Sequence, residues 1–387
     1  MVGKEPPVRE MIVGGIRIDD ESPCFVIAEI GHNHQGSVET AKKLFAAAKE
    51  AGADAVKLQK RDNRSLFTRD FYERPYDSEN SFGETYGSHR EALEMGAGEY
   101  RELQAYAAEL GIGFFSTAFD RPSVDFLEEI DVPAYKVASG DIRNVPLLRH
   151  LAQTGKPIIL STGGALPADV ARAYSIVSAG SDNVGILQCT AGYPAAWDEL
   201  DLRVIQTYRK NFPKAVVGLS SHDNGIAMAT AAHVLGARIV EKHFTLDRTM
   251  KGTDHSFSLE PAGLTKLVRD LSRLHVALGD GQKKVYESER APVMKMSKKL
   301  VAARPLPADH VIGPDDIAIK SPGDGMCPSD FDRLIGARVL RRMEADTPFG
   351  LALVEAAEAH VGAMNGNVVG AGASSRNGAS SAGVPRA

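Results

Sequence analysis

Short runs of apolar and β-branched residues alternate with helix-period patterns between residues 23 and 280. The intervening segments, such as 37–52, 98–111 and 224–236, carry apolar residues on one helical face, and several end in the glycine typical of a helix C-cap. Strands that alternate with helices pair in parallel through right-handed crossovers. Eight runs predict strands: 24–29, 55–59, 113–118, 134–139, 157–162, 185–190, 216–221 and 238–243.

Eight such units in about 250 residues predict a TIM (β/α)8 barrel rather than an open doubly wound sheet. No GxGxxG turn follows any predicted strand, as a dinucleotide-binding sheet would require. The second unit is enlarged by a long loop at 60–96, and loops of this length often act as lids or bind substrate.

The pattern also divides the rest of the chain. We predict an N-terminal arm at 1–22, the barrel at 23–280, a polar linker at 281–297 and a small β-rich domain at 298–357. Residues 362–387 are mostly Gly, Ala, Ser and Asn, a composition that predicts a disordered tail.

Charge and cysteine content narrow the class of protein. Lys and Arg number 45 against 50 Asp and Glu, giving a net charge of -5, and the basic residues are dispersed, so we expect no nucleic-acid partner. Three cysteines without paired spacing exclude a disulfide scaffold. No signal peptide and no long apolar run is evident, so we expect a cytoplasmic protein without membrane contact.

The predicted strands end in polar residues, which in a TIM barrel meet at one mouth. A lone serine or threonine at a strand end is usually a cap or a backbone hydrogen-bonder. A convergent set of lysines, histidines, glutamates and hydroxyls instead predicts a reactive site. The members of this set are Glu29, Lys57, Gln59, Ser116, Thr117, Lys136, Ser139, Ser161, Thr162, Gln188, Thr190, Ser220, His222, Glu241 and His243.

Two kinds of chemistry follow from the residue types. Lys57 and Lys136, with nearby hydroxyls, could hold a small anion that carries phosphate and carboxylate groups. His222 and His243 end adjacent strands and could supply two imidazoles to a divalent metal, although two histidines are by themselves a weak metal signal.

Seven motifs in this order resemble the sialic acid synthase family. That family is a TIM barrel followed by a small antifreeze-like, or SAF, domain, and it condenses phosphoenolpyruvate with an N-acyl hexosamine aldehyde. The products are inorganic phosphate and a nine-carbon 2-keto-3-deoxy sugar acid. The motifs are FVIAEIGHNHQGS (25–37), GADAVKLQ (52–59), AYKVASGD (134–141), GKPIILSTGG (155–164), LQCTAGYP (187–194), GLSSHDNGIA (218–227) and EKHFTLDRTMKGTDHSFSLEP (241–261).

The resemblance implies roles for individual residues. It implies Mn²⁺ or Mg²⁺ on His222 and His243, and a homodimer in which the SAF domain is swapped between subunits. Residues implied to be catalytic are Glu29, Lys57, Lys136 and Glu241. Those implied to bind phosphoenolpyruvate or the sugar are Asn80, Thr117, Ser139, Ser161, Thr190, Tyr193, Ser220 and Asp254.

Two departures leave the acceptor sugar open. Ala191 replaces the Asn of the family's CTNxYP motif, and Ser321, after Lys320, stands where an SAF-domain Arg is typical. The TYG and YGSHREALE stretches are similar to the branch that uses N-acetylmannosamine 6-phosphate instead of N-acetylmannosamine. The charge for such a phosphate could come from Lys60, Arg61 or Lys251.

Other functions remain as alternatives. A synthase of legionaminate, pseudaminate or KDN type would use the same site. A Schiff-base keto-acid aldolase would use Lys136 as nucleophile. An ice- or carbohydrate-binding role for the SAF-like domain would leave the lysines and histidines of the barrel unexplained.

Overall fold

The computed structural model describes residues 8–355 and separates two compact units, Met1–Gly281 and Gln282–Ala387. The predicted tail at 362–387 lies outside the described residues.

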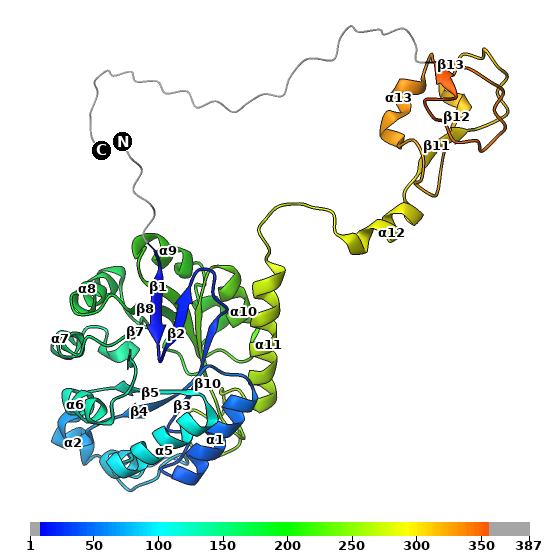
Figure 1. Ribbon diagram of the computed structural model, residues 1–387. Coiled ribbons are helices and arrows are strands. Elements are labelled where there is room, and N and C mark those ends of the chain that lie inside the picture. The colour runs from blue at the N-terminus through cyan, green and yellow to red at the C-terminus, as the bar shows by residue number, and fades with distance from the viewer. Residues whose placement is uncertain (1–7, 356–387) are drawn as a thin grey trace, which may run out of the picture. The chain divides into compact units, whose positions relative to one another are not determined.

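The first unit is a closed eight-stranded parallel barrel, as the sequence predicts (Figure 1). Each strand pairs with its neighbour in the chain, and the last closes the barrel against the first. Such strands are buried on both faces, which explains their nearly continuous apolar runs. They are β3 (Phe25–Gly31), β4 (Ala55–Lys60), β5 (Gly113–Ala118), β6 (Tyr135–Val137), β7 (Ile158–Ser161), β8 (Val184–Cys189), β9 (Val216–Ser221) and β10 (Ile239–His243).

Helices surround the strands and bury a second apolar layer against them. Local sequence sets their ends: the Ser37 and Asp120 side chains cap two helices, and Gly111 at φ 65° ends a third. These helices are α1 (Val38–Glu50), α5 (Ala97–Leu110), α6 (Arg121–Ile130), α7 (Val145–Gln153), α8 (Pro167–Val177), α9 (Val204–Asn211), α10 (Ala227–Val234) and α11 (Pro261–Ala277).

The predicted N-terminal arm contains a β-hairpin. Strands β1 (Glu10–Val13) and β2 (Ile16–Asp19) pair antiparallel. Their buried side chains Met11, Val13 and Ile18 join the apolar cluster inside the barrel. Four-residue strands with alternating burial give too short a pattern to be recognised from sequence.

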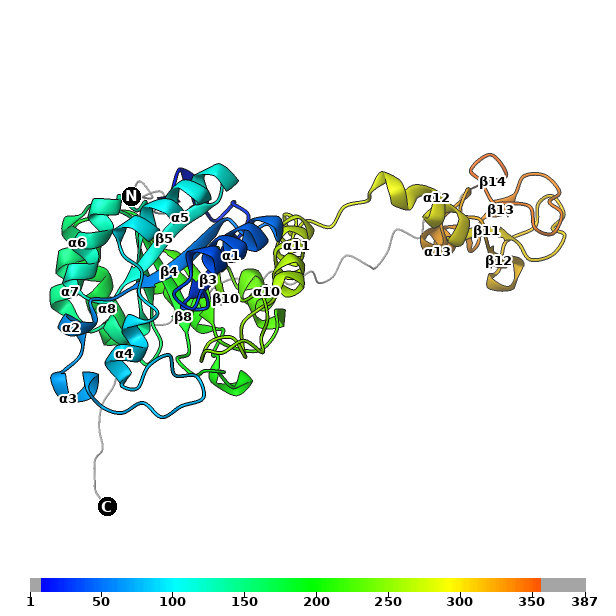
Figure 2. The same ribbon diagram turned by 90° about the horizontal axis from the view of Figure 1, so that it is seen from below.

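The enlarged second loop is partly helical. It carries α2 (Asn63–Leu66), α3 (Arg69–Tyr72) and α4 (Tyr86–Glu91), which contact one another on one side of the barrel (Figure 2). Phe67, Phe71 and Tyr86 stack in one cluster, with ring centroids 4.5 to 5.7 Å apart. The loop therefore has a small core of its own.

The second unit has its own apolar core, which includes Leu300, Leu306, Val339 and Phe349. The loop-like linker predicted at 281–297 is wrong in part, because α12 (Glu287–Met296) lies within it and the Glu289 carboxylate caps its first turn. The β-rich pattern corresponds to β11 (Lys299–Ala302), β12 (Ile317–Lys320), β13 (Arg338–Val339) and β14 (Val354–Glu355), with the short helix α13 (Phe331–Leu334). Within residues 8–355, no helix is long and apolar enough to cross a membrane.

Candidate active site

The interior of the barrel changes from apolar to polar within one step along each strand. Alternate residues of a strand share a face, so a residue two positions on lies directly above its predecessor. The apolar layer includes Phe25, Ile27, Ala55, Phe115, Ala134, Ile159, Leu187 and Ile239. Two positions beyond seven of these lie Glu29, Lys57, Thr117, Lys136, Ser161, Cys189 and Glu241. The site is therefore a polar layer built on an apolar floor, at the carboxyl ends of the strands.

Lys57 lies at the centre of this layer. Its backbone is in register with Glu29 on β3, and Nζ lies 2.6 Å from the Glu29 carboxylate. The same ammonium donates a hydrogen bond of 2.7 Å to Thr117 Oγ1 and lies 3.6 Å from Glu241. Only 2% of Lys57 is exposed, so its charge acts in a site that largely excludes water.

A second lysine shares the same carboxylate. Lys136 Nζ donates to Ser161 Oγ at 2.6 Å and lies 3.5 Å from Glu241 Oε1. Ser220, in register with Glu241, donates to that oxygen at 3.5 Å, whereas Oε2 of Glu241 is buried without a hydrogen-bond partner. Two ammonium groups and several hydroxyls thus face one space. The ammonium groups can donate further hydrogen bonds to a ligand, and Glu241 Oε2 can accept one.

The two glutamates differ in proton affinity because burial dominates at Glu29 and the lysine charges dominate at Glu241. Burial raises the pKa of Glu29 to about 7, with the charge of Lys57 opposing and that of Glu241 adding to the rise. Burial also acts on Glu241, but the ammonium groups of Lys136 and Lys57 outweigh it and hold the pKa of this carboxyl below its usual range. Burial lowers the pKa of Lys136. Near neutral pH the site therefore contains one proton-exchanging carboxyl and one carboxylate.

The two imidazoles predicted as metal ligands lie side by side, with ring centroids 5.3 Å apart. His222 Nδ1 lies 2.9 Å from the Thr190 carbonyl, an arrangement in which Nδ1–H donates and leaves Nε2 free to bind a metal. His243 Nδ1 is buried without a hydrogen-bond partner, and it lies 3.7 Å from Asp254. Burial lowers the pKa of both rings, that of His222 to about 4, so both are neutral at pH 7.

This donor set fits a divalent ion only in part. Within the part of the chain that the structure describes, no group of three or more His, Cys, Asp or Glu side chains could hold a metal. The protein's contribution is therefore the imidazole pair, and an ion bound there would take its other ligands from water or substrate.

A cavity of about 630 Å³ collects the predicted residues. The residues to which the resemblance assigns roles all line it except Thr190, whose hydroxyl donates to the Glu199 carbonyl and whose own carbonyl orients His222. Three other polar residues predicted at strand ends also lie outside the cavity wall and bond elsewhere: Ser116 to the Tyr100 hydroxyl, Thr162 to the Leu187 carbonyl and Gln188 to the Leu200 carbonyl. Tyr193 stacks on His222 at a centroid distance of 4.1 Å, and Asn80 accepts a hydrogen bond from the Gly252 backbone.

Several lining residues were not singled out from the sequence. His32, Phe82, His89 and Arg90 come from the segment after β3 and from the enlarged second loop. Their positions depend on how that loop folds back over the barrel, which no periodic pattern encodes. Arg61 had been one of three candidate cations, and the structure places it in the cavity wall.

Comparison with known proteins supports this assignment of the fold. Residues 44–283 match the model of the NeuB family, and residues 299–355 match that of the SAF domain. N-acetylneuraminate-9-phosphate synthase of Homo sapiens is 41% identical over 341 residues, which cover 88% of this chain and 95% of the relative. N,N'-diacetyllegionaminic acid synthase of Legionella pneumophila is 36% identical over 330 residues, 84% of this chain and 92% of the relative.

A solved structure agrees with these sequence matches. N-acetylneuraminic acid (sialic acid) synthetase from Leptospira borgpetersenii, crystallised with citrate, is 33% identical with a TM-score of 0.65. The match covers 75% of this chain and 97% of that one. The family model covers more than half of the chain, and both relatives match along most of their length. The chain therefore belongs to the NeuB family, with an SAF domain after its barrel.

Proposed function

We propose that this protein condenses phosphoenolpyruvate with the open-chain aldehyde of an N-acyl hexosamine, giving a nonulosonate of the sialic acid type and inorganic phosphate. The observation that carries the proposal is the buried polar layer, in which two lysines, two glutamates and several hydroxyls face one cavity. The names of the relatives, an N-acetylneuraminate-9-phosphate synthase and a legionaminic acid synthase, support the same reaction class.

The two lysines are the proposed binding groups for phosphoenolpyruvate. Its carboxylate and phosphate would replace the glutamates as partners of Lys57 and Lys136, with Thr117 and Ser161 donating from beside them. Ser139 and Ser220 complete a ring of hydroxyls in the same wall. Anion binding by buried ammonium groups is strong because little water competes.

The bond changes then follow from the substrates. C3 of the enol phosphate forms a bond to the aldehyde carbon, and the aldehyde oxygen takes up a proton. This attack leaves a positive charge at C2, to which water adds with loss of one proton, so that C2 carries both a hydroxyl and the phosphate ester. The C2–O bond to phosphate then breaks with its electrons on the phosphate, the hydroxyl loses its proton, and C2 becomes a ketone. In this proposal the Glu241 carboxylate stabilises the positive charge at C2 and Glu29 exchanges the proton, which the lowered pKa of the first and the raised pKa of the second support.

We further propose that His222 and His243 hold Mn²⁺ or Mg²⁺, which when bound supplies Lewis-acid polarisation of the aldehyde oxygen. Tyr193, Asp254 and Asn80 line the same cavity and are the proposed contacts to the sugar. We also propose a homodimer in which the SAF domain is swapped between subunits.

The test is phosphate release by the purified full-length protein. With Mn²⁺ present, release from phosphoenolpyruvate is expected only when a suitable N-acyl hexosamine is added, and mass spectrometry should find the nonulosonate. No release across a panel of free and 6-phosphorylated N-acyl hexosamines would contradict the proposal. The Lys57→Met variant should lower kcat/KM by roughly 10²- to 10³-fold. A matched control, Lys156→Met, changes a half-buried lysine outside the cavity and should leave turnover unchanged.

A second candidate function has one observation in its favour. The lowered pKa of Lys136 would also suit an amine that forms a Schiff base with a keto acid. Borohydride reduction in the presence of pyruvate separates the two, because only an imine is trapped as a stable adduct. An adduct on Lys136 would favour the aldolase, and its absence favours the condensation.

A further inference from the structure

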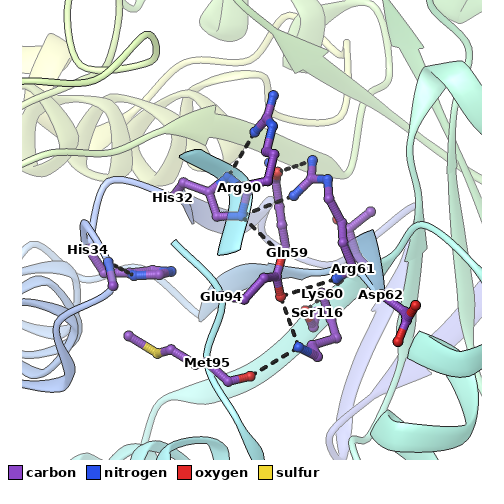
Figure 3. Close-up of polar contacts among 12 residues, drawn as sticks. His32, His34, Gln59, Lys60, Arg61, Asp62, Arg90, Glu94, Met95 and Ser116 are labelled. Carbon is purple, nitrogen blue, oxygen red and sulfur yellow. Dashed lines mark hydrogen bonds and ion pairs between the residues drawn. The ribbon is translucent and has the colours of Figure 1, made fainter. Parts of the chain in front are cut away.

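The cavity has a second cationic group, on the side formed by the enlarged loop. Arg61, which follows β4, and Arg90 of α4 both line the cavity wall (Figure 3). Neither guanidinium lies within 4 Å of a carboxylate among residues 8–355. Arg61 is only 8% exposed and packs on the Phe119 ring at 3.6 Å. Glu94 and Asp254 act on the Arg61 charge only from beyond 4 Å. Buried charged groups are normally paired, so the Arg61 guanidinium is open to an anionic ligand.

One imidazole lies between the two arginines and cannot satisfy both. Arg61 Nη1 lies 3.0 Å from His32 Nε2, and Arg90 Nη1 lies 3.3 Å from His32 Nδ1. Burial, with Arg61 adding to it, lowers the pKa of His32 well below its usual value, so the ring is neutral. A neutral imidazole has one acceptor nitrogen and one N–H donor. One of the two guanidinium contacts therefore lacks an acceptor.

The other cations near this wall are already engaged. Lys60 Nζ forms an ion pair of 2.9 Å with Glu94 and donates to the Met95 carbonyl, which neutralises that carboxylate. Lys251 lies over the Phe82 ring at 4.8 Å and does not line the cavity. Of the three cations considered from the sequence, only Arg61 faces the cavity, and Arg90 joins it from a loop that the sequence pattern did not resolve.

A chain of polar contacts connects this pair to the lysine end of the cavity. Arg61 donates to Gln59 Oε1 at 2.7 Å, Gln59 Nε2 donates to Glu29 Oε1 at 2.7 Å, and Glu29 pairs with Lys57. The arginines and lysines thus face one cavity, with Gln59 and Glu29 between them. A ligand with anionic groups at both ends could contact both.

We propose that Arg61 and Arg90 bind the phosphate monoester of a 6-phosphorylated N-acyl hexosamine and thereby select it over the unphosphorylated sugar. The inference rests on the condensation proposed above. In the open-chain acceptor, the reacting aldehyde at C1 and the phosphate at C6 are at opposite ends, which matches two cationic groups separated by polar residues. Guanidinium forks bind phosphate oxygens with two parallel hydrogen bonds, and a dianion would supply the acceptor that His32 cannot.

The test compares two acceptors that differ only in the 6-phosphate, using full-length protein. We expect the wild-type protein to favour the phosphorylated acceptor. In the Arg90→Gln variant, the ratio of kcat/KM for phosphorylated over unphosphorylated acceptor should fall on the order of 10- to 100-fold, chiefly through KM. Arg61→Gln should act in the same direction, and Arg61→Lys should recover only part of the loss because it lacks the fork.

Arg64→Gln is the matched control, since Arg64 is exposed, lies three residues beyond Arg61 and does not line the cavity. Circular dichroism and melting curves establish that each variant is folded, and Arg90→Gln serves if the buried Arg61 cannot be replaced.

Each outcome is decisive. An equal loss with both acceptors, or a loss confined to the KM for phosphoenolpyruvate, would overturn the assignment of these arginines to the acceptor phosphate. A wild-type protein without preference for the phosphorylated sugar would overturn it too, while leaving the condensation intact. If neither acceptor supported the release of phosphate from phosphoenolpyruvate, the proposed function itself would be contradicted.

Discussion

Burial shifts the protonation of several histidines in the barrel, and His34 is the clearest case outside the imidazole pair. Its Nδ1 accepts a hydrogen bond of 3.0 Å from the Gly36 backbone, and burial lowers its pKa to about 4 from an ordinary 6.5, although the charge of Glu94 opposes the shift. The folded protein thus keeps this ring neutral where an unfolded chain would protonate it.

The stability of the barrel should therefore fall in mild acid. Below pH 6.5 His34 binds a proton in the unfolded state, whereas in the folded state it binds one only at about pH 4. The contribution of the neutral His34 ring to the free energy of unfolding is therefore fully present above pH 6.5 and is lost as the pH falls toward 4. The loss amounts to about 3 kcal/mol over that interval. Denaturant unfolding at pH 7.5 and 4.5 measures it, and in His34→Gln the drop should be smaller. An identical drop in both proteins would show that His34 contributes nothing to it.

At the scale of elements, one buried ion pair ties β9 and β10 together behind the site. Lys242 Nζ lies 2.9 Å from the Asp223 carboxylate and donates to the Asp223 carbonyl at 2.6 Å. Ser221 also donates to this carboxylate. Asp223 directly follows His222, and Lys242 directly precedes His243, so the pair holds together the two chain segments that carry the imidazoles.

Breaking this pair should cost far more than breaking a surface pair. Asp223→Asn leaves a buried ammonium without its counter-charge, and we expect a loss of about 3–5 kcal/mol in the free energy of unfolding. The control is Asp131→Asn, which removes an exposed partner of Lys156 and should change stability little. Chemical denaturation of both variants measures the difference. Equal effects would mean that the buried pair has no special structural role.

The enlarged second loop is the element on which the proposed choice of acceptor depends most. It supplies Asn80, Phe82 and Arg90 to the cavity, and its aromatic cluster holds α4 in place. The barrel strands supply the groups proposed to act on phosphoenolpyruvate. In these proposals the strands therefore carry out the reaction, and the loop selects the acceptor. This division is typical of TIM barrels.

At the scale of the whole molecule, the chain consists of two units with separate apolar cores. The proposed swapped homodimer would bring the SAF domain of one subunit to the barrel of the other. The family's usual SAF-domain arginine is absent, since Ser321 occupies that position.

Complementation tests the swap. We expect full-length Lys57→Met and a chain ending at Gly281 each to have little activity, and their mixture to recover turnover, because an intact barrel would then meet an intact SAF domain. Phosphate release by the separate and mixed proteins is the measurement, with circular dichroism as the folding control. A mixture no more active than its components, while wild-type protein is active, would argue against the swap.

Much of the fold could be predicted from the sequence because parallel strands buried on both faces form short, nearly continuous apolar runs. All eight barrel strands were found in this way. The β1–β2 hairpin, α12 and the helices of the second loop were not, because they are short or are held by contacts distant in the chain. Among the site residues, most of those at strand ends were predictable from alternation, whereas Ser116, Thr162, Gln188 and Thr190 lie outside the cavity wall and bond to other parts of the barrel.

The sequence by itself determined the barrel, the polar layer at its mouth and the residue types available there, because strand periodicity fixes which side chains share a face. Only the tertiary structure decided how they pair. It decided that Lys60 is neutralised by Glu94, that Arg61 meets Arg90 across His32, and that two lysines lower the proton affinity of Glu241 while burial raises that of Glu29. These properties depend on distance and exposure to water, which residues far apart in the chain acquire only when the loops fold over the strands.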